Sequence, residues 1–148
     1  MDRLTISNQS ITDVFIMDFM YDRYGNSQTL YEFLPSMRKL DLSGNKIETF
    51  QVEADISNKS IKTIYLTNNR LQTVPLAIPK FKELKKLELS VNQIEVVETQ
   101  LFSSFSGLSV NLSHNSDLIM RSVMNSRVLS HRYGRNAFML DEICVVMG

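Results

Sequence analysis

Apolar residues recur at fixed places in a unit that this chain repeats. Residues 84–94 read LKKLELSVNQI, with apolar residues at the first, fourth, sixth and eleventh places and Asn92 at the ninth. The same pattern begins at Met37 and at Ile61, and it returns, one residue short, around Val110. The units start at 37, 61 and 84, so the steps between them are 24 and 23 residues. A fixed period in this range predicts a stacked-repeat architecture, in which each unit forms one coil.

The alternation inside each unit predicts a short β-strand. Leu87 and Leu89 flank Glu88, so a strand here points both leucines to one side and the glutamate to the other. A strand of this length cannot bury its apolar side alone, and stacking therefore brings equivalent strands together as a parallel sheet. Each buried Leu or Ile contributes roughly 1.5–3 kcal/mol. The expected rows contain the pairs Leu40/Leu42, Ile64/Leu66, Leu87/Leu89 and Val110/Leu112.

Four asparagines occupy the ninth place of the unit: Asn45, Asn69, Asn92 and Asn115. The chain must turn out of the strand there, which leaves buried backbone N–H and C=O groups without partners in the sheet. An inward Asn amide offers two donors and an acceptor, enough to bond the loop of its own coil and of the next. Asn is also a common turn residue, but four at one phase of the repeat favour a structural asparagine ladder.

The pattern resembles the leucine-rich repeat family. The segment between strands resembles that family's longer, typical class, because residues 94–108 fit its LxxLxxxLFxxLxxL pattern and Val74 and Phe81 follow a similar one. The resemblance covers the regular repeats, at about 37–118. It implies an α/β horseshoe with short parallel strands on the concave face and irregular or short helical segments on the convex face. We expect residues 1–148 to form a single such solenoid.

The two flanks depart from the repeat. A first coil with Gln9 in the Asn place precedes the regular repeats, and the next strand begins about a dozen residues later than the period predicts. The surplus lies at about 17–30 and forms either a protruding binding loop or an enlarged convex turn. From 119 to 148 the period fades, and this region holds a degenerate last repeat or a cap. Residues 128–138 fit the repeat weakly, while 137–147 suit a capping strand or helix.

Composition and motifs limit the function classes. Sixteen basic and sixteen acidic residues give zero net charge, which argues against a nucleic-acid binder that relies on bulk charge. The apolar runs are too short to span a bilayer. A single cysteine, Cys144, excludes a disulfide framework, and neither His114 nor His131 has metal-ligand spacing around it. Because the strong catalytic motifs are also absent, we predict no catalytic residue, metal or cofactor. The oligomeric state is not predicted.

Two opposing signals bear on the compartment. The N-terminus lacks the basic-then-apolar layout of a signal peptide, which taken literally keeps the chain inside the cell. However, Met1 already occupies the first place of a coil, and the typical repeat class resembles extracellular proteins. We therefore expect a piece of a secreted protein, with a cytoplasmic location as the alternative. Asn8, Asn58 and Asn111 begin glycosylation sequons, of which chance supplies about two in such a chain.

The concave face offers the candidate binding surface. Residues between the leucines point there and form an acidic and aromatic stripe around Tyr65 beside a basic ridge. Tyr65 is the candidate anchor for a charged protein surface; the alternative is that these charges only keep the sheet soluble. The candidate partner-binding residues are Arg38, Lys39, Asp41, Lys62, Tyr65, Lys85, Lys86 and Glu88, and a column of hydroxyls (Ser7, Ser43, Thr67, Ser90 and Ser113) lies on the other side.

Three functions are open at this point. The resemblance implies a non-catalytic protein-binding module, most similar to extracellular insect-type leucine-rich repeat proteins of innate immunity or adhesion. The second is an intracellular repeat scaffold or regulatory subunit. The third is the targeting part of an enzyme whose catalytic region is joined elsewhere. The first expects a leader and cysteine caps in a longer chain, the second expects a stable cytosolic chain with Cys144 reduced, and the third expects an attached catalytic domain.

Overall fold

The computed structural model of this chain describes residues 3–16, 37–52, 60–115, 119–121, 131–132, 137–140 and 143–146. The insertion predicted at about 17–30 and the sequon residue Asn58 lie outside the described residues. Of the region 119–148, the description covers four short strands.

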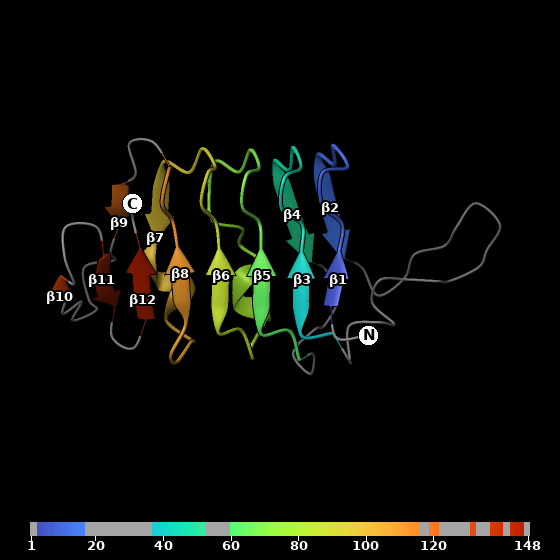
Figure 1. The fold of residues 1–148 in the computed structure, drawn as a ribbon. Coiled ribbons are helices and arrows are strands. Elements are labelled where there is room, and N and C mark those ends of the chain that lie inside the picture. Colours follow the sequence, from blue (N-terminus) through green and yellow to red (C-terminus); the bar gives the residue numbers. More distant parts are fainter. Residues whose placement is uncertain are drawn as a thin grey trace.

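One side of the molecule is a sheet of eight short strands (Figure 1). In their order across the sheet they are β1 (Arg3–Thr5), β3 (Lys39–Asp41), β5 (Thr63–Tyr65), β6 (Lys86–Glu88), β8 (Ser109–Asn111), β12 (Ile143–Val146), β11 (Ala137–Leu140) and β10 (His131–Arg132). The strands from β1 to β12 pair in parallel, and β11 and β10 continue the sheet antiparallel. Four of these strands, β3, β5, β6 and β8, follow the repeat period, as expected for one strand per coil, and β1 precedes them by the longer step seen in the sequence.

The register of the parallel strands aligns the leucine row across the sheet. Leu4, Leu40, Ile64, Leu87 and Val110 are successive partners on neighbouring strands. The last four are fully buried, at 0% exposure. The prediction that stacked coils hide their apolar sides against one another is confirmed. Since each such side chain contributes roughly 1.5–3 kcal/mol on burial, this row is a large part of what holds the coils together.

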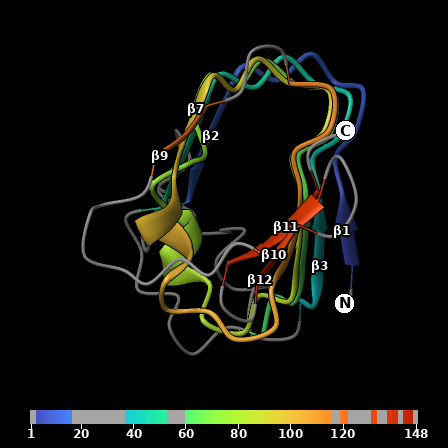
Figure 2. The same cartoon turned by 90° about the vertical axis from the view of Figure 1, so that its left-hand side faces the viewer.

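The chain crosses from the sheet to the opposite side of each coil and returns, as the view along the stack in Figure 2 shows. Two further parallel pairs lie on that side, namely β2 (Asp13–Ile16) with β4 (Thr49–Val52) and β7 (Val96–Glu98) with β9 (Ile119–Arg121). Two 3-10 turns, η2 (Ile78–Lys80) and η3 (Thr99–Phe102), complete it. The core between the two sides includes Phe50 and Phe81, whose ring centroids are 6.1 Å apart. This side thus combines irregular and briefly helical segments, as predicted, with two short parallel strand pairs that were not predicted.

The ninth-place asparagines bond two coils at once. The Asn69 amide nitrogen donates to the carbonyl of Leu66 in its own coil (3.0 Å) and to that of Leu42 in the preceding coil (3.1 Å). Its Oδ1 accepts from the amide of Ile47, also in the preceding coil (3.0 Å). Three other asparagines repeat this arrangement: Asn45, Asn92 and Asn115.

The direction of these bonds differs from the prediction, which had each asparagine reach the next coil. Each side chain leans back to the preceding coil because that coil's turn presents both a carbonyl and an amide that the sheet does not use. Gln9 does not act as a first rung of the ladder. Its side chain donates to the Ser7 carbonyl, while its backbone N–H donates to Asn45 Oδ1 at 2.9 Å.

A left-handed residue precedes the ninth place in every coil. Its φ lies between 55° and 68° at Asn8, Gly44, Asn68, Val91 and His114. Gly, Asn and His tolerate this conformation, but a β-branched residue such as Val rarely adopts it. At Gly44 an added Cβ would also press on the side chain of Asn8, which would have to move. Val91 is therefore the strained member of the series.

At the C-terminal end, β12 lies beside β8, where the strand of a further repeat would be. Val145 pairs with Val110, and β11 folds back antiparallel with Leu140 opposite Ile143. The weak repeat match at 128–138 supplies β10 and the start of β11 at the far edge, not the strand next to β8.

No helix in the part of the chain that the structure describes has the length and apolar character needed to cross a membrane.

Candidate functional site

Two columns of outward side chains cover the parallel strands, and together we call them the sheet face. They are outward because the leucines between them point into the core, which gives the strands an exposed, buried, half-buried pattern. The strand register aligns the members of each predicted column on neighbouring strands. Neighbouring strands are about 4.8 Å apart. One column is Arg3, Lys39, Thr63, Lys86 and Ser109, and the other is Thr5, Asp41, Tyr65, Glu88 and Asn111.

An ion pair closes the N-terminal end of the sheet face. Arg3 Nη2 lies 2.7 Å from Asp41 Oδ2, and Arg3 Nε donates to the Thr5 hydroxyl at 3.0 Å. The other Asp41 oxygen accepts from the backbone N–H of Ser43 (3.1 Å). Burial raises the pKa of Asp41, but the hydrogen bonds from Ser43 and the charge of Arg3 outweigh it and leave that pKa below its usual value. Asp41 is therefore held as a carboxylate and contributes to the structure.

An aromatic ring and an ion pair occupy the centre of the face. Lys86 Nζ lies 3.0 Å from Glu88 Oε1 and 5.6 Å from the centroid of the Tyr65 ring. The hydrogen bond and the charge of Glu88 raise the pKa of Lys86, against a small opposing effect of burial. The ammonium is therefore held over the ring in a cation–π geometry. This places a half-buried tyrosine, oriented by a cation, between β3 and β6.

Basic residues line the edge where the strands begin. We call Arg38, Lys39, Lys62, Lys85 and Lys86 the basic edge; all five are exposed. The Lys62 N–H donates to the Arg38 carbonyl, and the Lys85 N–H donates to the Lys62 carbonyl, both at 2.8 Å. The Lys85 ammonium bonds the Ser106 carbonyl at 2.9 Å, so it is turned toward the loop before β8.

The side chains of the hydroxyl column are half-buried, except that of Ser90, which is buried. Thr67 and Ser90 share a hydrogen bond at 3.3 Å. Beyond it lies Val91, which is 44% exposed. This exposed apolar residue was not predicted from the sequence. The signal was available, because Val91 stands where the other coils have Asn, Gly or His.

The sequon residues differ in their surroundings. Asn8 is exposed at the turn over Gly44. Asn111 is half-buried in the sheet face, and its Oδ1 accepts from the Ser113 N–H at 3.0 Å. A glycan on Asn111 would stand two strands from Tyr65 and would cover the C-terminal end of the face.

No metal centre is visible among the described residues, where no three His, Cys, Asp or Glu side chains gather. His114 is exposed at its turn, His131 lies in β10, and Cys144 lies in β12 opposite Ser109. The expectation that the chain lacks catalytic residues, metals and cofactors stays a prediction.

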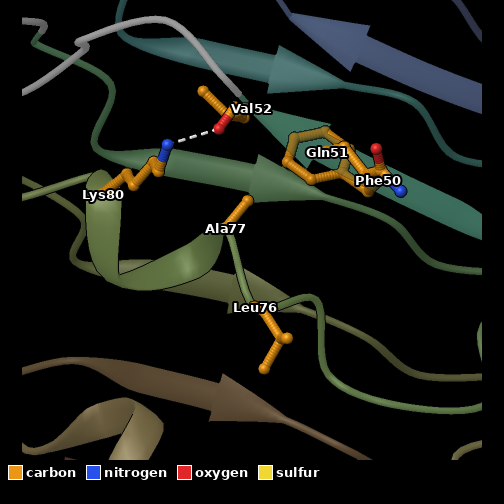
Figure 3. A pocket seen from close by; sticks show the side chains of 6 residues that line it. All are labelled: Phe50, Gln51, Val52, Leu76, Ala77 and Lys80. Carbon is orange, nitrogen blue, oxygen red and sulfur yellow. Dashed lines mark hydrogen bonds between the residues drawn. The ribbon is translucent and has the colours of Figure 1, made fainter.

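An open hollow of about 230 Å³ lies across the coil from the sheet face, between β4 and η2 (Figure 3). Phe50, Val52 and Ala77 give it an apolar floor, and the Lys80 ammonium donates to the Val52 carbonyl at its rim. Leu76, which is 80% exposed, points away from the other lining residues. Lys80 is the one ionisable group among the described residues that line it.

Comparison with known proteins identifies the repeats. Residues 59–116 match the family model described as leucine rich repeat.

The chain is also similar to parts of longer proteins. It is 31% identical over 83 residues to human (Homo sapiens) leucine-rich repeats and immunoglobulin-like domains protein 1, and the match covers 55% of this chain and 8% of that protein. It is 32% identical over 99 residues to Tsukushi of Mus musculus, 65% of this chain and 27% of that protein. It is also 29% identical over 90 residues to the probable serine/threonine-protein kinase pats1 of Dictyostelium discoideum, covering 61% of this chain. That match covers 3% of the kinase, so the chain spans only a minor part of each relative.

Proposed function

Since this chain belongs to the leucine-rich repeat family, we propose that it is a non-catalytic module that binds a protein partner through its sheet face. The family membership supports protein–protein interaction in general. The surface that carries the interaction is our own proposal.

The observation that supports this surface is the cluster of Tyr65, Lys86 and Glu88. Inward positions of β5 and β6 are completely buried and account for the packing of the coils. The outward cluster lies on the other side of the strands from that packing, and it holds the Tyr65 ring under a cation. Tyr is enriched at the centres of protein interfaces, where the partner buries the ring, and charged residues such as Lys and Glu belong to the polar rim around it.

The test begins by placing the photo-crosslinking residue benzoylphenylalanine at Tyr65 and, as a matched position on the other side of the coil, at Gln51. A protein that crosslinks at Tyr65 and not at Gln51 is then purified, and its Kd is measured. We expect Tyr65→Ala with Lys86→Glu to weaken that Kd by about tenfold or more, because truncation of an interface anchor costs about 2 kcal/mol or more.

The same double variant should melt at nearly the wild-type temperature, because both side chains lie outside the core. Lys46→Glu is the control for charge reversal, since Lys46 is exposed on the segment that leads away from the sheet to β4. A Kd that is unaltered in the double variant removes the sheet face as the binding surface.

We further propose that the chain works outside the cell as a glycoprotein of innate immunity or adhesion. Support comes from the sequons at Asn8 and Asn111, which the structure places on the surface or partly so. The endogenous protein should then appear in the medium, and its mobility should increase on treatment with an N-glycosidase. A protein found in the cytosol with an unmodified Asn8 would exclude this proposal.

A second candidate is that the repeats serve as the targeting part of an enzyme. The support for this candidate is that the chain is similar to part of a probable serine/threonine-protein kinase. This candidate requires a catalytic domain joined to the repeats in the natural protein, which intact-mass measurement of the endogenous protein would detect. An intracellular scaffold without such a domain would show the cytosolic location but no added mass.

A further inference from the structure

The basic edge concentrates like charge on three neighbouring strands. Arg38, Lys62 and Lys85 stand one strand apart, because each carbonyl accepts the N–H of the next residue in the row. Lys39 and Lys86 extend the same edge onto the sheet face through the register of β3, β5 and β6. Neighbouring residues in such a row are about 4.8 Å apart along the sheet.

Among the described residues, no carboxylate forms an ion pair with Lys39 or Lys62. Glu88 is paired with Lys86, and Asp41 is already engaged by a sixth cation, Arg3. Glu83, in the turn before β6, forms no ion pair with a described residue. The Lys85 ammonium bonds a carbonyl, which satisfies one donor but leaves its positive charge in place.

The fold itself does not need this arrangement. Like charges on neighbouring strands repel one another and destabilise a sheet. The chain has equal numbers of acidic and basic residues, so the cluster does not follow from a basic composition. Opposite charges on neighbouring strands, such as Arg3 and Asp41, would have avoided this repulsion. A cluster that costs stability and lies beside Tyr65 is well placed to attract an anionic partner.

We propose that the basic edge receives an acidic segment of the protein partner, with its carboxylates facing Lys39 and Lys62 and an adjoining side chain packing on Tyr65. This proposal rests on the proposed function, because it names the chemistry of the partner at the same face. A uniform polyanion fits less well. Asp41 and Glu88 form the next column and would repel it, whereas a protein can place a basic or apolar residue there.

The size of the basic edge also favours a protein segment over nucleic acid. It spans three strands, or about 10 Å from the first to the third. Tight binding to nucleic acid draws on many phosphate contacts along the duplex or strand. A few carboxylates of one acidic loop or strand match the extent of the edge.

The test uses the full chain and a fluorescein-labelled peptide of six glutamates followed by two phenylalanines, which supply the adjoining apolar side chains that a uniform polyanion lacks. It is titrated by fluorescence anisotropy at low and at physiological salt. We expect measurable binding that weakens with salt, as for exposed charges. Lys62→Glu should weaken it by about tenfold, and Lys46→Glu should change it less than twofold. Lys62→Glu should not lower the melting temperature, because it removes repulsion from Arg38 and Lys85.

Three outcomes overturn the proposal. The first is no binding of the glutamate peptide at low salt, and the second is an equal loss with Lys46→Glu, which indicates non-specific attraction. The third is a heparin fragment that binds at least as tightly as the peptide and depends equally on Lys62, which indicates a sulfated glycan. If Lys62→Glu does not fold, Lys62→Gln provides the same comparison. The Tyr65 variant and the crosslinked partner test whether the sheet face binds a protein at all. A negative result with the peptide would therefore reject the acidic segment without rejecting the sheet face as the binding surface.

Discussion

The inward and outward sides of the same short strands obey different rules. On the inward side, the four coils that contain β3, β5, β6 and β8 each repeat an aliphatic pair and an asparagine, and their aliphatic residues are fully or almost fully buried. On the outward side, the equivalent position is Asp41, Tyr65 and Glu88 in turn, two carboxylates of different length and an aromatic ring. The fold therefore depends chiefly on the inward half of each strand, and the outward half is where we propose that recognition takes place.

The largest expected effect comes from the buried side of this comparison. Asn69→Ala removes the partners of the Leu42 carbonyl and the Ile47 N–H, both in the preceding coil. Leaving a buried polar group unpaired costs about 1–3 kcal/mol, and here two coils lose groups together. We expect the free energy of unfolding, measured in urea, to fall by about 3 kcal/mol.

Arg70→Ala is the control for that measurement, since Arg70 is the next residue and its only ion pair with a described residue, Glu48, is long at 4.0 Å and exposed. Its effect should stay below about 1 kcal/mol. If Asn69→Ala is as mild as Arg70→Ala, the asparagines do not hold the coils together.

The second prediction concerns the turn between the two sides. Val91 adopts a φ of 55° that costs a branched side chain roughly 1–2 kcal/mol, and its exposed position gives little packing in return. Val91→Asn, which copies Asn68 of the preceding coil, should raise the free energy of unfolding by about 1 kcal/mol.

The reverse exchange, Asn68→Val, should lower the free energy of unfolding by a similar amount, because the two positions share one backbone conformation. Equal destabilisation by both variants would show that Val91 is held by its contacts and that the turn rule does not apply there.

The inward side could be predicted from the sequence because its rules are periodic. The spacing of Leu87, Leu89 and Asn92 predicts the strand, its register and the place of the turn, and the register of the sheet agrees with it. The direction of the asparagine bonds could not be predicted this way. A period states which residues are equivalent, but the lean of the side chain toward the preceding coil depends on the turn geometry.

The outward side was predictable as a set of positions and not as a set of contacts. The columns that contain Asp41 and Tyr65 follow from strand register alone. The pairing of the charges does not follow from the register. Arg3 pairs with Asp41, Lys86 pairs with Glu88, and the Lys85 ammonium donates to a loop carbonyl instead. Long flexible side chains choose partners by local geometry, which no sequence spacing encodes.

The smallest expected effect sharpens the comparison, because Asp41 is an outward residue that also serves the fold. Its side chain is 14% exposed and its pKa is lowered in the folded state, so folding favours the carboxylate. The resulting stabilisation is present above the unfolded pKa of about 3.9 and is lost as the pH falls through the lower folded pKa. Asp41→Asn should therefore lower the free energy of unfolding by less than about 1 kcal/mol at pH 6. In urea titrations the difference from wild type should shrink toward zero at acidic pH, and a cycle with Arg3→Gln should show the same loss of coupling. A difference that does not change with pH would mean that Asp41 acts through its shape and hydrogen bonds rather than its charge.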